Sequence, residues 1–138
     1  MKNAVAMVST IFIPVTDVKR SAVWYARMFD METIELNDRR AGLTFPKAET
    51  VVILWKVREP QPVEFDTGDG KMHYFNFSSF DIHASYKTLQ AKGAALSPIH
   101  ELQGFRFFET YDPDRNVFNI VEETPESPYY AHKQRHRK

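Results

Sequence analysis

The stretch YDPDRNVFNIVEE near the C-terminus has the residue types and the spacing of a calcium-binding loop. Asp112, Asp114 and Asn116 occupy alternate positions, and Glu123 is the twelfth residue counted from Asp112, where an EF-hand places a bidentate carboxylate. An EF-hand loop also needs glycine at its sixth position, which is Val117 here. The residues that follow favour a strand instead of a helix, so the pattern argues against calcium.

The same stretch is better explained as a β-hairpin. Residues 112–115, Asp-Pro-Asp-Arg, have the composition of a type I turn, because proline fixes φ at the second position and aspartate bonds the local backbone. A bulge at Arg115 would close the turn and pair FRFFETY with VFNIVEE, which places Glu109 opposite Asn119. A different loop register, with Glu109 facing outward, fits the sequence equally well.

Length and composition indicate one domain that folds without cross-links. The chain has 138 residues, 18 basic and 18 acidic side chains, no cysteine and 14% aromatic residues. Disulfides, thiolate zinc sites and cysteine nucleophiles are therefore excluded. The balanced charge does not favour nucleic acid or an anionic membrane. We expect a cytoplasmic protein, since the first residues lack the pattern of a signal peptide and no segment is long and apolar enough to span a membrane.

The chain repeats one order of expected elements. A strand over 9–15 leads into a helix over 16–31 with Asp17 as N-cap, and the order returns with a strand over 72–79 and a helix over 80–94 with Asp81 as N-cap. Three strand-like pieces follow each helix, at 32–36, 41–46 and 50–57 and then at 95–100, 105–111 and 117–123. This order indicates an internal duplication of a β-α-β-β-β unit.

Three markers resemble the vicinal oxygen chelate superfamily, which includes glyoxalase I, extradiol dioxygenases, fosfomycin resistance proteins and bleomycin resistance proteins. The first is a strand, a capping aspartate and a helix that carries the aromatic pair Trp24 and Tyr25. The second is the repeat of this arrangement at Asp81, and the third is the DPDxN hairpin. Together they extend the resemblance over nearly all of residues 8–123.

The resemblance implies an α+β fold of two tandem βαβββ modules that form a half-open mixed β-barrel, with helices on the outside and a small-molecule cavity inside. It also implies a homodimer. We therefore expect one domain over 1–124, with module one at about 8–57, a linker at 58–71 and module two at about 72–123. A basic flexible tail is expected at 125–138.

Metal-dependent members of the superfamily hold a divalent cation with histidine and glutamate side chains from the first and last strands of each module. Counted from the capping aspartates and the DPDxN motif, the matching positions here are Thr10, Ile53, Tyr74 and Asn119. None of them is a histidine or a carboxylate, which are the donors that such metals need. The sequence therefore predicts no metal and no other cofactor.

The alternation of side chains along a strand assigns the cavity face independently of the metal argument. If Thr10 and Phe12 face the cavity, then Ile11, Ile13 and Val15 face the helix, as a helix-covered sheet requires. The same reasoning in the second half turns Phe75, Phe77, Phe118 and Ile120 toward the helix. The residues expected to bind a ligand are Thr10, Phe12, Ile53, Trp55, Tyr74, Asn76, Glu109 and Asn119.

His73 is adjacent to one of the family's metal positions. In a continuous strand it points away from the face of Tyr74, and only a bulge would bring it into the cavity. We therefore interpret His73 as a partly solvated residue at a strand edge. Glu109, if buried, is a candidate general base or an anchor for a cation or hydroxyl group of a ligand.

Two functions of different class fit these observations. One is a glyoxalase- or bleomycin-resistance-like protein that binds a small organic molecule in an aromatic cavity without a metal. The other is a metal-dependent lyase, isomerase or dioxygenase that uses displaced ligands such as His73, Glu109 or His100. Besides these two, a third possibility is an interaction module that contacts an acidic partner through its basic tail. The missing donors at the four family positions favour the first function.

Overall fold

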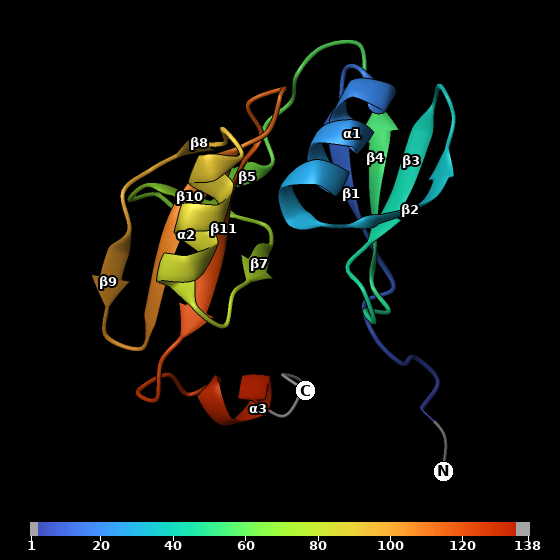
Figure 1. Cartoon of the computed structure of the whole chain (residues 1–138). Coiled ribbons are helices and arrows are strands. Elements are labelled where there is room, and N and C mark those ends of the chain that lie inside the picture. The colour runs from blue at the N-terminus through green and yellow to red at the C-terminus, as the bar shows by residue number, and fades with distance from the viewer. Residues whose placement is uncertain (1–2, 135–138) are drawn as a thin grey trace. The chain divides into compact units, whose positions relative to one another are not determined.

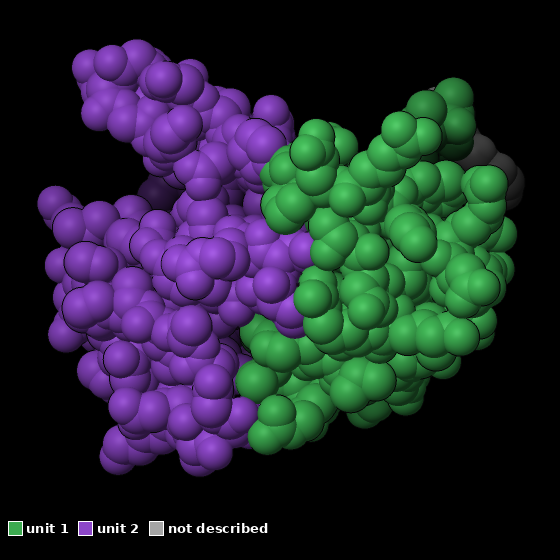
Figure 2. Space-filling view, turned by 90° about the horizontal axis from the view of Figure 1, so that it is seen from above, with its two compact units in different colours: residues 1–61 green, residues 62–138 purple. Residues whose placement is uncertain are grey.

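The computed structural model describes residues 3–134, which form two compact units divided after Gln61 (Figures 1 and 2). We call residues up to 61 unit 1 and residues from 62 onward unit 2. Both units combine helix and sheet, which confirms the α+β class. No helix among the described residues has both the length and the apolar composition needed to cross a bilayer.

Unit 1 is a four-stranded sheet with one helix on it (Figure 1). Its elements are β1 (Thr10–Val15), α1 (Val18–Phe29), β2 (Glu32–Leu36), β3 (Arg40–Thr44) and β4 (Val51–Lys56). The strand order is β1-β4-β3-β2, with β1 and β4 parallel. The Asp17 carboxylate accepts a 3.1 Å hydrogen bond from the backbone N–H of Arg20, which confirms the predicted N-cap.

The core of unit 1 lies between α1 and the sheet. Ile13 and Val15 are completely buried on the face of β1 that the alternation assigned to the helix, whereas Phe12 is exposed. The helix buries Val18, Ala22 and Tyr25. Burying each large apolar side chain stabilises a fold by about 1.5–3 kcal/mol. The burial of Ile13 and Val15 therefore determines which side of β1 faces the helix.

Unit 2 begins with three strands before its first helix and contains a larger set of elements. These are β5 (Glu64–Asp66), β6 (Lys71–His73), β7 (Asn76–Ser78), α2 (Ile82–Ala91), β8 (Ala95–Leu96), β9 (His100–Leu102), β10 (Phe105–Tyr111), β11 (Val117–Glu123) and α3 (Tyr130–Gln134). The main sheet runs β7-β11-β10-β8, with β9 also on β10, and β5 pairs only with β6. β7 and β11 are parallel.

The strand expected over 72–79 is in fact two strands. β6 pairs with β5, whereas β7 pairs with β11, so the chain changes partner between His73 and Asn76. The hairpin of β5 and β6 also occupies part of the segment 58–71 that the sequence predicts as a linker. The strand expected over 95–100 is interrupted as well, because Pro98 has no N–H to donate to a ladder.

Aromatic side chains form the core of unit 2 between α2 and the main sheet. The rings of Phe77 and Phe118 are 4.7 Å apart, and Tyr86 of α2 meets Phe108 edge-on at 5.1 Å. Phe118 and Ile120 are buried, as the alternation predicts. The opposite face of β10 and β11 is therefore free of these core residues.

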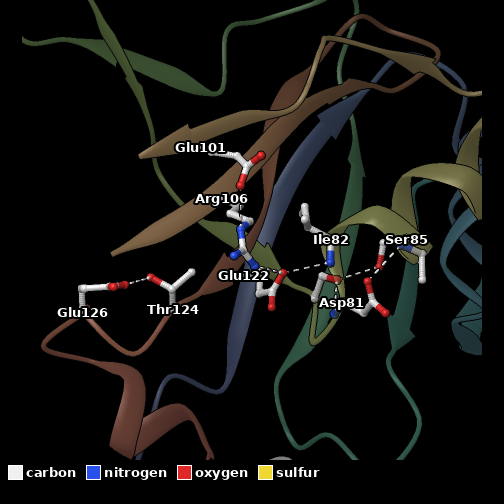
Figure 3. Close-up of polar contacts among 10 residues, drawn as sticks. Asp81, Ile82, Ser85, Glu101, Arg106, Glu122, Thr124 and Glu126 are labelled. Carbon is white, nitrogen blue, oxygen red and sulfur yellow. Dashed lines mark hydrogen bonds and ion pairs between the residues drawn. The ribbon is translucent and has the colours of Figure 1, made fainter. Parts of the chain in front are cut away.

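Two carboxylates hold the start of α2. The Asp81 carboxylate accepts the N–H of Ala84 at 3.1 Å, and Glu122 Oε1 of β11 accepts the N–H of Ile82 at 3.0 Å (Figure 3). The first N–H groups of a helix have no partner within it, so both contacts stabilise the helix end. Arg106 of β10 lies 3.5 Å from the same Glu122 oxygen, which connects the helix start to both long strands.

The hairpin between β10 and β11 closes through Asp112. The N–H of Arg115 donates to the Asp112 carbonyl at 2.8 Å, and the Asp112 N–H donates to the Asn116 carbonyl at 3.0 Å. Asp112 Oδ1 accepts the N–H groups of Asp114 and Asn116 at 2.8 and 2.9 Å. Arg115 has φ = 65°, the left-handed conformation of the expected bulge.

The turn confirms the register that places Glu109 opposite Asn119. It also explains the calcium-like pattern. β11 carries Glu123 to the far end of a seven-residue strand, about 20 Å from the turn at ~3.4 Å per residue. Asp112 and Glu123 therefore do not approach one another as calcium ligands in a loop do.

We expect Arg115→Gly to stabilise the protein, because a non-glycine residue in the left-handed region costs about 1–2 kcal/mol. Arg115→Ala keeps this cost and loses the guanidinium, which lies 5.5 Å from the centre of the Tyr111 ring. Urea unfolding should place the glycine variant above the alanine variant by about 1 kcal/mol. Equal stability of the two variants would contradict the assigned turn.

Candidate functional site

Unit 2 contains a cavity of about 540 Å³ on the sheet face opposite α2. β10 contributes Phe105, Phe107 and Glu109 to its wall, because these alternate residues share one face of the strand. β11 contributes Asn119 and other residues of the equivalent face. The volume lies within the range of about 300–1,000 Å³ typical of small-molecule sites.

Glu109 is the centre of a polar cluster in this cavity. Its Oε1 accepts a 3.2 Å hydrogen bond from the Tyr111 hydroxyl, and its Oε2 lies 3.5 Å from His73 Nε2. Ser97 fixes the backbone of Glu109, since the Ser97 hydroxyl accepts the Glu109 N–H at 2.8 Å. The His73 side chain is only 8% exposed and that of Glu109 is 35% exposed, so the ligand-accessible group is the carboxylate.

The interpretation of His73 as an outward-facing edge residue is wrong. Because the strand breaks after β6, His73 and Asn76 both line the cavity, although in a continuous strand they would point to opposite faces. Tyr74, within the break, is 67% exposed and its ring lies 5.2 Å from that of Phe65. Tyr74 is outside the set of residues that line this cavity.

Two buried polar atoms of the cavity residues have no hydrogen-bond partner among residues 3–134. They are His73 Nδ1 and Asn119 Oδ1. A buried polar atom without a partner is unfavourable, since it has lost its hydrogen bonds to water. Both atoms lie beneath the exposed surface of the wall, so the exposed part of Glu109 is the member of this cluster that a bound molecule can reach.

Burial raises the pKa of the Tyr111 hydroxyl, and the neighbouring negative charge of Glu109 and the hydrogen bond to it raise that pKa further. A proton on the phenol is needed for the hydrogen bond to Glu109. The cluster therefore keeps Tyr111 protonated at neutral pH, as the hydrogen-bond donor to Glu109.

The predicted site residues of unit 1 share one face of the β1–β4 pair. Phe12 is opposite Ile53, Thr10 is two residues before Phe12, and Trp55 is two residues after Ile53. Phe12 and Trp55 are 60% and 41% exposed, with their rings edge-on at 6.2 Å. Arg40 lies over the Trp55 ring at 5.9 Å and donates to both oxygens of Glu35, which lowers the pKa of that carboxyl.

The C-terminal segment of the cavity wall was not predicted from the sequence. Glu126, Ser127, Pro128 and Tyr129 line the cavity, and Ser127 donates to Glu123, which also lies 3.5 Å from Lys133 Nζ. The predicted flexible tail thus makes specific contacts over the part that the structure describes, and residues 135–138 lie outside that part. Phe105 and Phe107 were not predicted as cavity residues either. Their even spacing from Glu109 along the strand indicates that all three share one face.

Comparison with known proteins identifies the family. A sequence profile of the Glyoxalase/Bleomycin resistance protein/Dioxygenase superfamily matches residues 7–120, and the chain belongs to this superfamily. None of the curated proteins compared with the chain matches it significantly.

Solved structures of the superfamily share the fold at low sequence identity. A member from Sphaerobacter thermophilus is 24% identical, with a TM-score of 0.70 over 86% of this chain and 98% of that one. The antibiotic-binding protein TnmS3 from Streptomyces sp. is 17% identical, with a TM-score of 0.69 over 89% of this chain and 100% of that one. Lactoylglutathione lyase from Agrobacterium tumefaciens is 13% identical, with a TM-score of 0.67 over 87% and 96% of the two chains.

The side chains at the four family metal positions do not fit a divalent cation. Thr10, Ile53, Tyr74 and Asn119 present a hydroxyl, an alkyl group, a phenol and an amide, which are weak donors or none. The displaced pair of His73 and Glu109 supplies two strong donors, whereas catalytic zinc sites use three protein ligands. Within residues 3–134, no group of three or more histidine, cysteine, aspartate or glutamate side chains gathers as a metal site would need.

We expect Glu109→Gln to lower the pKa of Tyr111 toward its ordinary value of about 10, because the substitution removes a negative charge beside the phenol. Because the pKa of Tyr111 is raised in the native state, the unfolded chain loses the phenol proton first. The contribution of this raised pKa to the free energy of unfolding therefore decreases as the pH rises above about 10. NMR titration of tyrosine labelled at Cζ measures the change. Glu101→Gln, at a carboxylate that contacts Arg106 instead, should leave the Tyr111 titration unaltered.

Proposed function

We propose that this protein binds a small organic molecule in the unit 2 cavity and does so without a metal. The observation that carries the proposal is the combination of an aromatic wall with the partly exposed carboxylate of Glu109 in one cavity. Ligand sites are built in this way, with a mostly apolar surface and a few directional polar groups. The likeness to TnmS3, which is described as antibiotic-binding, is in keeping with this function.

The proposal includes the wider arrangement that membership of the superfamily suggests. We propose that units 1 and 2 are the two tandem βαβββ modules of a half-open barrel and that the chain forms a homodimer. In this arrangement the predicted residues of unit 1 (Thr10, Phe12, Ile53 and Trp55) and Tyr74 contribute further ligand contacts. Analytical ultracentrifugation tests the dimer independently of the ligand.

A metal-dependent lyase, isomerase or dioxygenase is the second candidate function. The observation that favours it is the 3.5 Å separation of His73 Nε2 and Glu109 Oε2, since an imidazole and a carboxylate this close are suitable metal ligands. A metal site formed by His73 and Glu109 would need further ligands besides these two.

Filling the cavity should abolish ligand binding. We expect compounds found by a thermal-shift screen to stabilise the wild-type protein, by about 2.7 kcal/mol at a hundredfold excess over Kd. Asn119→Phe places a large side chain on the cavity wall and should remove the stabilisation. Val23→Phe, on an exposed face of α1, is the matched control and should retain it. Equal stabilisation of both variants would place the ligand elsewhere.

Divalent cations separate the two candidate functions. We expect melting curves with millimolar Zn²⁺, Mn²⁺, Ni²⁺ or Fe²⁺ to coincide with the curve in EDTA, because two donors make a weak site. Elemental analysis of the purified protein should give no stoichiometric metal. A bound metal that is lost in His73→Ala or Glu109→Ala, but kept in His83→Ala on α2, would establish the metal-dependent function instead.

A further inference from the structure

Glu109 is the exposed acceptor of the polar cluster in the unit 2 cavity. A carboxylate only accepts hydrogen bonds, and 35% of the Glu109 side chain is exposed. His73 Nε2 lies 3.5 Å from its Oε2. His73 Nδ1 is buried and has no partner in the described part of the chain.

Asn119 continues this pattern on the neighbouring strand. It lies directly opposite Glu109, and its Oδ1 is a second buried acceptor without a partner in residues 3–134. Glu109 itself receives one hydrogen bond, from the neutral Tyr111 hydroxyl. The exposed part of the Glu109 carboxylate can therefore accept further hydrogen bonds, which an N–H-rich ligand group supplies and a carboxylate or phosphonate does not.

The charges around the cavity also favour a cation. Its wall contains the carboxylates of Glu109, Glu123 and Glu126 and one basic side chain, Lys71. Glu123 is engaged by Lys133, which lies 3.5 Å away. By contrast, the side-chain contacts of Glu109 are to Tyr111 and His73. A carboxylate in a partly desolvated wall attracts a positively charged ligand group.

The apolar part of the wall is suited to a flat ring. Phe105 and Phe107 are stacked with centroids 5.9 Å apart, and His100 is stacked on Phe107 at 4.9 Å. Phe107 is two residues from Glu109 on the same face of β10, so the ring surface adjoins the carboxylate. Aromatic faces also interact favourably with a neighbouring cation.

We propose that the unit 2 cavity recognises organic cations in which an ammonium or amidinium group is attached to an aromatic body. The charged group donates to Glu109, and the ring lies against Phe105 and Phe107. This proposal rests on the proposed binding function and specifies the ligand class of the same site.

Three indole compounds of similar size test the ligand class. Tryptamine carries an ammonium group, tryptophol a hydroxyl and indole-3-propionate a carboxylate. Isothermal titration calorimetry should give about tenfold tighter binding for tryptamine than for tryptophol, and no measurable binding for indole-3-propionate, because only the first supplies a charged donor. Glu109→Gln should remove the preference for tryptamine over tryptophol, whereas Glu101→Gln, at a carboxylate outside the cavity wall, should retain it.

The comparison among the three compounds uses the wild-type protein, so it does not depend on how well a variant folds. Equal or tighter binding of tryptophol or indole-3-propionate would overturn the cation proposal, and so would failure of all three to bind. In either case, compounds that stabilise the wild-type protein but not Asn119→Phe would still support small-molecule binding. Loss of that difference as well would overturn both proposals.

Discussion

The register between β10 and β11 is the constraint on which the unit 2 site depends. The buried Asp112 carboxylate organises the turn that sets this register, and the register places Glu109 opposite Asn119. Side chains alternate along a strand, so a slip of one residue would move Phe108 and Phe118 out of the core and bring the polar pair into it. The aromatic core against α2 and the polar cavity wall are therefore two results of one hairpin geometry.

The break between β6 and β7 adds the third member of the cluster. An uninterrupted strand would leave His73 and Asn76 on opposite faces, whereas the change of partner from β5 to β11 brings both to the cavity. This arrangement leaves His73 Nδ1 and Asn119 Oδ1 buried, with no hydrogen-bond partner among residues 3–134. A buried polar atom without a partner is unfavourable, so the arrangement has a cost in stability.

Local chemistry made part of this structure predictable from the sequence. The carboxylates of Asp17 and Asp81 cap helices by accepting N–H groups three residues further along the chain, and the turn at Asp112 is encoded in five consecutive residues. The helix-facing positions of β1 and β11 followed from alternation. By contrast, the inward position of His73 depends on which distant strand β6 pairs with, and short-range patterns contain no information on that choice.

The C-terminal part of the wall was unpredictable for a related reason. Residues 124–134 are polar and rich in turn formers, and their order comes from single contacts such as Thr124 N–H to the Gly104 carbonyl at 2.9 Å. The close approach of Gly104 to Ser127 depends on φ = +98° at Gly104, a conformation that favours glycine. Tyr129 lies in the same segment, so its position in the wall depends on these contacts too.

The Glu109 carboxylate is the group on which ligand binding in the cavity depends most, because it is the exposed member of the polar cluster. Carbon-13 NMR spectra of protein labelled at glutamate Cδ, assigned with the Glu109→Gln variant, report on this carboxylate. We expect the Glu109 resonance to shift when tryptamine is added and the Glu101 resonance to stay unchanged. A Glu109 resonance that tryptamine leaves unchanged would contradict the proposed site.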